Sequence, residues 1–380
     1  MYAAFLCTVL ALLWVSCSPA ALVQPPVEPT SELHFEIDPD VEFMGFIYHL
    51  SGLGRDAAAN DALVQTERGE VPESAYRAVG VGVYEQYRAY EDSPTLAAVL
   101  ERAGAADLSA LLALFRGADP VSRPGSAYAV PDDLARSLFP SSDSARARAQ
   151  ELAGLIADFA REVPFDAVLS ERRACYDSML AQVRASSPDP TLLALMESFY
   201  RQDFDAYVLV PSLLLPAGMA FGPKDVGSDG TRVYNVFGPM TAQAVGRGEC
   251  NPGFDSPVRL FELTVHEFGH SFVNHVVSDL PPSLVAGAEH RYGAVADAMR
   301  RQGYTNWETV LQEHFVRSGE VLLTRMAGRP SQSEALLRDY VKDRGFAYIP
   351  LVVPYLERYA GGHYGSYAEA VAAAVQGLSE

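Results

Sequence analysis

The segment HEFGH at residues 266–270 constrains the fold of this 380-residue chain more than any other feature. Its flanks, residues 257–277, read as one helix, with Ser256 as the N-cap and a proline at the first helical position. Residues four apart lie on the same face of a helix, so His266 and His270 present both imidazoles to one side. The fold must therefore place a third partner opposite this histidine face.

This residue pattern predicts a metal site with hydrolytic chemistry. Two imidazoles favour zinc (Zn2+) over calcium or magnesium, because nitrogen ligands suit zinc while the other two ions prefer oxygen. Glu267 stands beside His266 and His270, where it can accept a proton from a metal-bound water. The alternative is a buried helix whose histidines only satisfy hydrogen bonds. We predict zinc as the cofactor, the two histidines as ligands and Glu267 as the general base.

Two downstream glutamates compete to be the third protein ligand. Glu289 lies in the stretch 283–302, which could form a helix antiparallel to the first one. Glu313 lies in an apolar predicted helix, residues 307–326, and a buried carboxylate there needs a metal, a proton or a counter-charge such as Arg317 one turn later. Spacing alone does not choose between the two glutamates.

HEFGH with a downstream glutamate resembles the zincin metallopeptidases that use a glutamate ligand, the gluzincins. The chain is still more similar to an uncharacterised group of bacterial exported proteins described only as a domain of unknown function. The segments that carry this second resemblance are residues 41–43, 90–94, 266–274, 303–307 and 313–317. The resemblance implies a zincin-like fold and Glu313 as the third metal ligand.

The activity that the gluzincin resemblance implies is metal-assisted hydrolysis, and we expect a peptide or protein as the substrate. The resemblance to the uncharacterised group does not supply a substrate. Glu267 would take a proton from the attacking water and pass it to the leaving amine. The developing oxyanion needs a stabiliser besides the metal. We name His363 and Tyr364, in a glycine-flanked turn that could instead be an ordinary surface turn. The other candidates are His314, and His290 with Tyr292.

Asn274 follows His270 by one helical turn and could orient that imidazole from behind. Zincin-like enzymes often hold the substrate as an extra strand along a sheet edge. We expect residues 233–237, just before the metal helix, to form that edge, although they could also be a buried central strand. Residues 221–223 could border the cleft as well.

The fold class predicted from these patterns is α+β, with a mainly helical first half. We expect a helical region at 33–187 and a zincin-like catalytic region at 188–380. The expected helices of the first region cover about 74–90, 94–115, 144–161 and 166–186, with a loop at 117–143, and strands are expected at 207–215 and 231–237.

The amino terminus predicts export. Residues 2–15 form an uncharged apolar run that is too short to span a bilayer but suits a secretory signal peptide, residues 1–16. A small residue followed by Cys17 resembles the bacterial lipoprotein signal, so we expect a lipid anchor at Cys17 and a tether at 17–32, facing the periplasm or the cell exterior. The alternative is an ordinary cleaved signal.

The net charge and the number of cysteines limit which binding partners and which disulfides we expect. With 29 basic and 48 acidic residues the net charge is −19, which excludes nucleic acid as a partner and leaves the Cys17 anchor as the means of membrane attachment. Four cysteines are too few for a disulfide framework. In an exported protein Cys175 and Cys250 could form a disulfide or remain as two buried thiols.

Two other function classes stay open at this point. One is a surface-exposed binding lipoprotein whose metal site has no turnover, although an intact Glu267 argues against it. The other is a lipoprotein without any metal.

Overall fold

Helices make up most of the protein. The computed structural model describes residues 32–60, 62–66, 69–104, 106–123, 128–140, 142–227, 230–246 and 249–380. Over these residues the fold is mixed α+β, with 65% helix and 10% strand, which confirms the predicted α+β class. The expected signal peptide, Cys17 and nearly all of the tether lie outside them. No helix in the described part of the chain is both long and apolar enough to cross a membrane.

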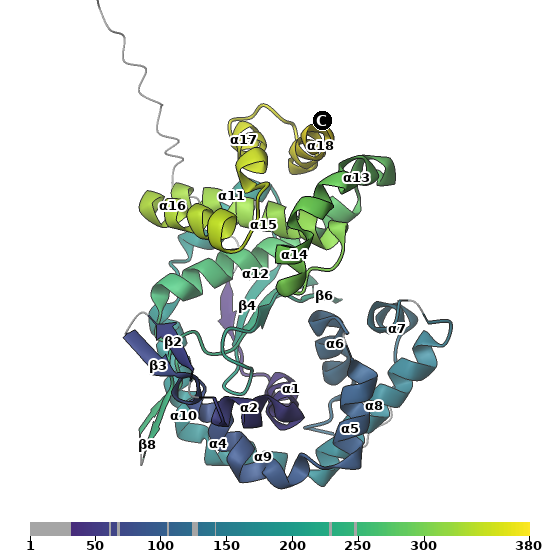
Figure 1. Cartoon of the computed structure of the whole chain (residues 1–380), viewed down its shortest axis with the longest axis vertical. Coiled ribbons are helices and arrows are strands. Elements are labelled where there is room, and N and C mark those ends of the chain that lie inside the picture. Colours follow the sequence, from purple (N-terminus) through teal and green to yellow (C-terminus); the bar gives the residue numbers. More distant parts are fainter. Residues whose placement is uncertain are drawn as a thin grey trace, which may run out of the picture.

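The first half of the chain is a helical arm that curves away from the sheet (Figure 1). The helix expected at 94–115 is two helices, because Gly104 ends the first of them with a positive φ of 48°. The expected loop at 117–143 contains a helix of its own, α7. The helices of this half are α1 Pro39–Tyr48, α2 Gly54–Ala58, α3 Glu73–Tyr76, α4 Ala78–Tyr87, α5 Pro94–Ala103, α6 Leu108–Ala118, α7 Asp132–Leu138, α8 Ala145–Glu162, α9 Phe165–Glu171 and α10 Arg173–Ser186.

The central sheet is mixed, with the order β1-β4-β7-β5 and with β6 also paired to β7. Parallel pairing joins β1 (Leu33–Phe35) to β4 (Ala206–Pro211) and β4 to β7 (Gly230–Phe237). Because β1 comes from the first half and β4 from the second, the sheet spans the predicted boundary at 187/188. Two small antiparallel pairs lie outside it, β2 Leu63–Thr66 with β3 Gly69–Pro72 and β8 Ala244–Gly246 with β9 Glu249–Asn251.

The expectation that residues 233–237 form the sheet edge is wrong. These residues belong to β7, which has β4 on one side and both β5 (Ala220–Phe221) and β6 (Lys224–Gly227) on the other. The pairs Ala220 with Phe237 and Gly227 with Gly230 belong to one antiparallel register, so β5 and β6 continue each other. The edge next to β7 is therefore the segment 220–227.

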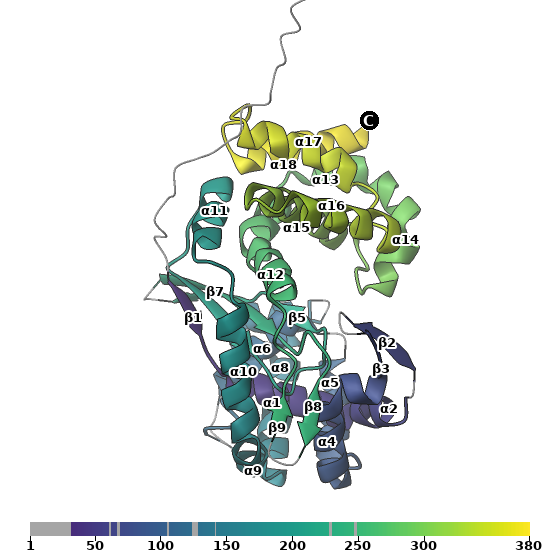
Figure 2. The same ribbon diagram turned by 90° about the vertical axis from the view of Figure 1, so that its left-hand side faces the viewer.

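The second half of the chain stacks helices on this sheet (Figure 2). The long helix α12 lies between β7 and β5 on one side and α15 on the other. The helices of this half are α11 Thr191–Tyr200, α12 Pro257–Ser278, α13 Pro282–Ala288, α14 Tyr292–Arg301, α15 Trp307–Met326, α16 Pro330–Arg338, α17 Ile349–Ala360 and α18 Tyr367–Ser379, with short helical turns η3 Glu289–Arg291 and η4 Asp339–Asp343.

Aromatic packing fixes the sheet side of α12. The ring of Phe268 lies 5.1 Å from that of Tyr207 on β4, and Phe272 stacks on Tyr200 of α11 at 4.5 Å. Both phenylalanines are buried completely or almost so. Burying one such side chain contributes roughly 1.5–3 kcal/mol. Because Phe268 and Phe272 face the sheet, His266 and His270 are turned towards α15.

A buried carboxylate attaches the first half to the sheet. Glu42 on α1 accepts hydrogen bonds from the backbone amides of Leu213 at 2.8 Å and Leu214 at 3.0 Å, just after β4. The hydroxyl of Tyr176 donates a third bond at 3.0 Å. Burial raises the pKa of Glu42 to about 7, although these donors act in the opposite direction. A buried carboxylate is tolerated here because its acceptor sites have donors.

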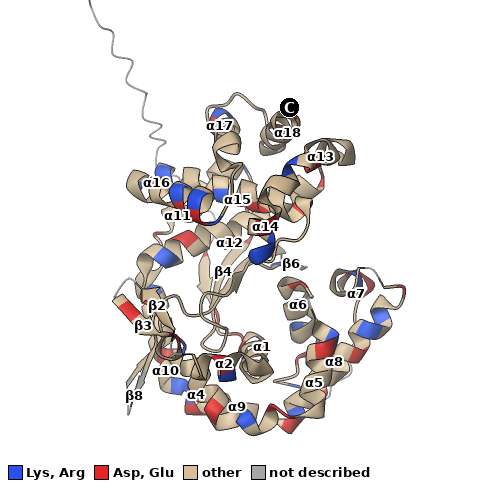
Figure 3. Ribbon diagram, viewed as in Figure 1, with Lys and Arg blue, Asp and Glu red and all other residues tan. Residues whose placement is uncertain are grey.

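Charged residues of both signs are interleaved on most helices, despite the net charge of −19 (Figure 3).

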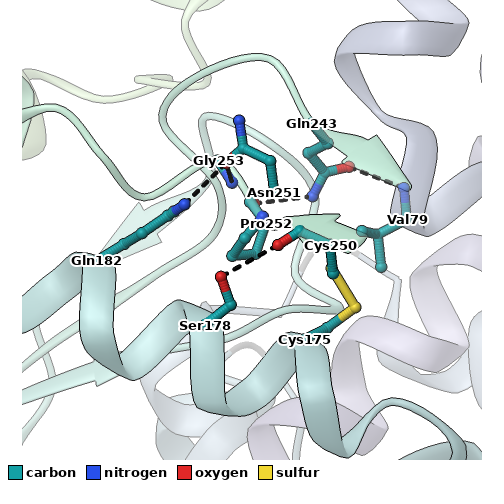
Figure 4. Close-up of a disulfide and its surroundings, with 9 residues drawn as sticks. All are labelled: Val79, Cys175, Ser178, Gln182, Gln243, Cys250, Asn251, Pro252 and Gly253. Carbon is teal, nitrogen blue, oxygen red and sulfur yellow. Dashed lines mark hydrogen bonds between the residues drawn. A yellow bond between two sulfur atoms is a disulfide. The ribbon is translucent and has the colours of Figure 1, made fainter. Parts of the chain in front are cut away.

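Cys175 on α10 and Cys250 on β9 form a disulfide, so the first of the two predicted alternatives is confirmed (Figure 4). Hydrogen bonds surround the bridge: Ser178 donates to the Cys250 carbonyl at 3.1 Å, and Gln182 accepts from the amide of Phe254 at 2.8 Å. Six residues after Cys250 the chain reaches Ser256, the N-cap of α12. The bridge therefore anchors the segment that leads into α12.

We expect the double variant Cys175→Ser/Cys250→Ser to unfold more easily than the wild-type protein. The bridge joins cysteines 75 residues apart in sequence. Closing a loop of that length lowers the entropy of the unfolded chain and stabilises the protein by about 4 kcal/mol. Urea unfolding of both proteins measures the difference, with reduced wild-type protein as the control. A difference below about 1 kcal/mol would show that the bridge is not a main source of stability.

Candidate metal centre

Capped helices hold the two parts of the site. The side chain of Ser256 accepts a hydrogen bond from the amide of Arg259 and so caps α12, as predicted. Asn306 caps α15 in the same way through the amide of Thr309 at 2.9 Å. Satisfying these amides fixes where each helix begins, and hence which face each side chain occupies. The crossing of α12 over α15 then decides which residues meet.

His266, His270 and Glu313 meet where these two helices cross. Each offers one ligand atom, and the three atoms lie within 4.8 Å of one another, the only such group among the described residues. The two histidine Nε2 atoms are 3.3 Å apart. Glu313 places Oε1 3.4 Å from Nε2 of His270 and Oε2 3.8 Å from Nε2 of His266.

These separations fit a small tetrahedral cation. Zinc bonds to histidine nitrogen and carboxylate oxygen measure about 2.0–2.2 Å, so neighbouring ligand atoms around it stand about 3.3–3.6 Å apart. Two of the three observed distances, 3.3 and 3.4 Å, fall in that range, and the third, 3.8 Å, is slightly longer. Three protein ligands leave a fourth position open, which is the arrangement of catalytic zinc sites.

Glu267 is buried beside this cluster, with 5% of its surface exposed. Burial, followed by the negative charge of Glu313, raises the pKa of Glu267 to about 8. A bound divalent cation would act in the opposite direction. A side chain at Gly222 would stand 2.3 Å from the backbone oxygen of Glu267, so only glycine permits this close approach. The edge segment 220–227 therefore passes directly beside Glu267.

Glu313 is ionised and held by a buried cation. Arg317 lies one turn further along α15, and its Nη2 is 3.1 Å from Oε2 of Glu313. Burial acts to raise the pKa of Glu313, but Arg317 and the two histidines outweigh it and lower the pKa to about 2. The hydroxyl of Tyr304 also bonds to Glu313 and contributes to this lowering. An ionised carboxylate is the form that binds a metal.

A second layer of polar groups lies behind the histidines. Nδ1 of His270 is 3.1 Å from Oδ1 of Asn274, in the position predicted for that residue. Nδ1 of His266 lies 3.3 Å from Oε2 of Glu320, which also accepts a 2.7 Å hydrogen bond from Tyr340. Carboxylates and amides in this position orient a ligand imidazole and leave its other nitrogen for the metal.

Replacing Glu320 by glutamine is expected to lower zinc affinity by about 10- to 100-fold, as loss of an outer-shell partner does in other metal sites. The reason is that His266 would lose the negatively charged oxygen that lies 3.3 Å from its Nδ1. Competition with a chromophoric chelator measures the affinity, after circular dichroism has shown that the variant is folded. Glu334→Gln, on the exposed side of α16, is the matched control. Equal affinities in both variants would show that Glu320 does not orient His266.

The structure does not bring the rival ligand Glu289 to the site. It is exposed in η3 and is not part of the described cluster. His290, beside it, is also exposed and bonds to the carbonyl of Gly287. His314 is buried and is not part of the described cluster, and its Nδ1 lies 2.7 Å from the carbonyl of Val310.

The turn after α17 holds the two predicted oxyanion stabilisers. His363 is exposed, and its ring lies 4.9 Å from the ring of Tyr364. Tyr364 in turn lies 5.6 Å from the guanidinium of Arg358. None of the contacts described for this pair reaches the metal cluster, so the catalytic role of His363 and Tyr364 stays a prediction. The hydroxyl that does reach the cluster belongs to Tyr304.

Three residues of the site were not predicted: Glu320, Tyr340 and Tyr304. A signal for Glu320 was present, because it follows Glu313 by seven residues and so shares its helix face. Tyr304 and Tyr340 lie in a loop and in η4, where periodicity gives no indication of direction.

Comparison with known proteins identifies the family of this chain but does not identify an activity. No curated protein and no solved structure matches the chain. A family model matches residues 126–367, more than half of the chain, and this range includes α12, α15 and the whole cluster. The predicted similarity to an uncharacterised group is thereby confirmed, and the chain belongs to the family described as a domain of unknown function (DUF4932).

Proposed function

We propose that this protein is an exported zinc-dependent hydrolase, and that its substrates are peptides. The observation that carries the proposal is the convergence of His266, His270 and Glu313, with Glu267 buried on the same helix as the two histidines. The donor set of two imidazoles and one carboxylate is the one found at catalytic zinc sites. We also propose that this arrangement of ligands is of the gluzincin type.

Each residue has a separate task in the proposed reaction. His266, His270 and Glu313 would hold the cation, which supplies a Lewis acid and an activated water when bound. Glu267 would accept the proton of the attacking water and deliver it to the leaving nitrogen of the peptide. Asn274 and Glu320 keep the imidazoles in place. Tyr304, whose hydroxyl bonds to Glu313, is a candidate to stabilise the oxyanion.

The edge segment 220–227 supports a peptide as the substrate. Its other side pairs with no strand of the described chain, and Gly222 brings it against the backbone of Glu267. An extended peptide could add to this edge by main-chain hydrogen bonds. The scissile bond would then lie close to Glu267. The edge assigned from the sequence, residues 233–237, cannot do this because both of its sides are paired.

The disulfide between Cys175 and Cys250 supports export. Such bridges persist in oxidising compartments and are rare in the cytosol. Together with the apolar amino terminus, it favours a protein facing the periplasm or the cell exterior, with Cys17 as the proposed lipid anchor.

Metal analysis and a peptide library test the proposal together. Protein purified without added zinc, then supplied with it and desalted, is expected to retain about one zinc per chain. The loaded protein is expected to cleave members of a broad library of short peptides, and a chelator should stop the cleavage. Zinc below half an equivalent would contradict the metal site. Full zinc without any cleavage would favour a binding lipoprotein instead.

A further inference from the structure

A second arginine lies near the candidate metal centre without a described role. Arg344 follows η4, in a segment that packs against α15 through the buried ring of Phe346. Its guanidinium lies 5.6 Å from the ring of Tyr340 and 5.8 Å from that of Phe346. The buried Arg317 contacts the same two rings, at 4.8 and 4.5 Å. Arg344 is therefore a neighbour of the residue that holds Glu313.

The position of Arg344 is fixed by Gln302 at the end of α14. Nε of Arg344 donates to the side-chain oxygen of Gln302 at 3.2 Å, and the side-chain Nε2 of Gln302 donates to the Arg344 carbonyl at 2.7 Å. These two hydrogen bonds hold both the backbone of Arg344 and the base of its guanidinium group. Nε is thus used, while the outer Nη groups form no ion pair with any described carboxylate. Partial burial leaves part of the side chain accessible to a ligand.

Several charged side chains surround the candidate metal centre beside Arg344. Arg317 is paired with Glu313, and two further carboxylates, Glu267 and Glu320, lie nearby. Arg344 places a second guanidinium beside the Tyr340 and Phe346 rings that Arg317 also contacts. Contacts connect this position to the ligands: the hydroxyl of Tyr340 donates to Glu320 at 2.7 Å, and Glu320 lies 3.3 Å from Nδ1 of His266.

We infer that Arg344 recognises a carboxylate of the substrate beside the scissile bond, so that the enzyme prefers peptides that present an anionic group there. This inference rests on the proposed function and names its substrate class. The group can be the carboxyl terminus of the peptide or an acidic side chain, since both offer two oxygens to the guanidinium fork. Tyr340 and Phe346 hold the guanidinium so that little side-chain freedom is lost on binding.

Binding of three defined peptides tests the inference. They are acetyl-phenylalanyl-leucine with a free carboxyl terminus, the same peptide as its amide, and an amidated peptide with aspartate in place of leucine. Calorimetry measures their affinity for zinc-loaded Glu267→Gln protein, which should not cleave them. A carboxylate bound by a guanidinium is expected to improve affinity by about 10- to 100-fold over the amide. The peptide that shows the gain identifies the source of the carboxylate.

The variant Arg344→Ala, added to Glu267→Gln, should remove this preference and leave the affinity for the neutral amide unchanged. Arg344→Lys should restore it in part, because lysine keeps the charge but not the fork. Arg301→Ala, an exposed arginine on α14, controls for the loss of one positive charge. If Arg344→Ala weakens acid and amide equally, Arg344 only stabilises the segment and the inference is wrong. It is also wrong if the parent protein binds neither anionic peptide better than the amide.

Failure of the inference and failure of the proposed function are distinguishable. Cleavage of library peptides without regard to a carboxylate would overturn the role of Arg344 and leave the hydrolase standing. Binding of the free acid that depends on Arg344, in a wild-type protein that cleaves nothing, would overturn the hydrolase and support the recognition of carboxylates.

Discussion

Replacing Glu267 by glutamine is expected to remove hydrolysis and leave zinc bound. Glutamine has nearly the same shape but cannot accept a proton from the attacking water. Loss of a general base costs roughly 100- to 10,000-fold in rate. None of the three ligand atoms belongs to Glu267, so the metal content of the variant should equal that of the wild-type protein.

Initial rates on a peptide that the wild-type protein cleaves, together with elemental analysis, measure both halves of this result. Glu262→Gln is the matched control, since Glu262 lies on the same helix and is half-buried, where it accepts a hydrogen bond from Gln332. The control should keep wild-type activity. Retained hydrolysis in Glu267→Gln would mean that another group takes the proton, and the proposed role of Glu267 would be wrong.

Replacing Glu313 is expected to have the largest effect on metal binding. Loss of an outer-shell partner costs about 10- to 100-fold in affinity, so loss of a ligand in Glu313→Ala should cost more than about 100-fold. Glu289→Ala is the control, because Glu289 is the rival ligand and lies exposed in η3. Equilibrium dialysis against zinc at known free concentration measures both variants.

The same substitution also leaves Arg317 without its partner. Breaking a buried ion pair in this way destabilises a protein by about 3–5 kcal/mol. Unfolding of the metal-free proteins must therefore be measured beside the dialysis, and Glu313→Gln, which keeps the shape of the side chain, serves as the milder variant. If Glu289→Ala loses zinc while folded Glu313→Ala keeps it, the ligand assignment is reversed.

The local sequence was sufficient to predict the helix that carries His266 and His270. The cap at Ser256, the spacing of His266 and His270 and the second-layer position of Asn274 all depend on contacts within about one helical turn. Such contacts follow from helical geometry alone, and the structure has each of them as predicted. The buried apolar helix with Glu313 was predictable for the same reason, because its periodicity extends over α15.

The sequence alone did not decide which distant segments contact one another. Residues 233–237 read correctly as a strand, but an apolar strand looks alike in the centre and at the edge of a sheet, and its partner 220–227 is short and contains Gly222. Glu313 and Glu289 are both glutamates downstream of the histidines, and spacing did not separate them. Cys175 and Cys250 could as well have stayed apart.

The sequence by itself determined the chemistry on one helix: two imidazoles on one face, a carboxylate beside them and an amide behind. Only the tertiary structure decided what faces that helix, namely Glu313 and Glu320 from α15, Tyr304 and Tyr340 from two further segments, and the sheet edge at Gly222. The physical reason is the distance along the chain over which the deciding contacts act. A helix sets its own periodicity through hydrogen bonds four residues apart, whereas the crossing of two helices depends on the packing of the whole core.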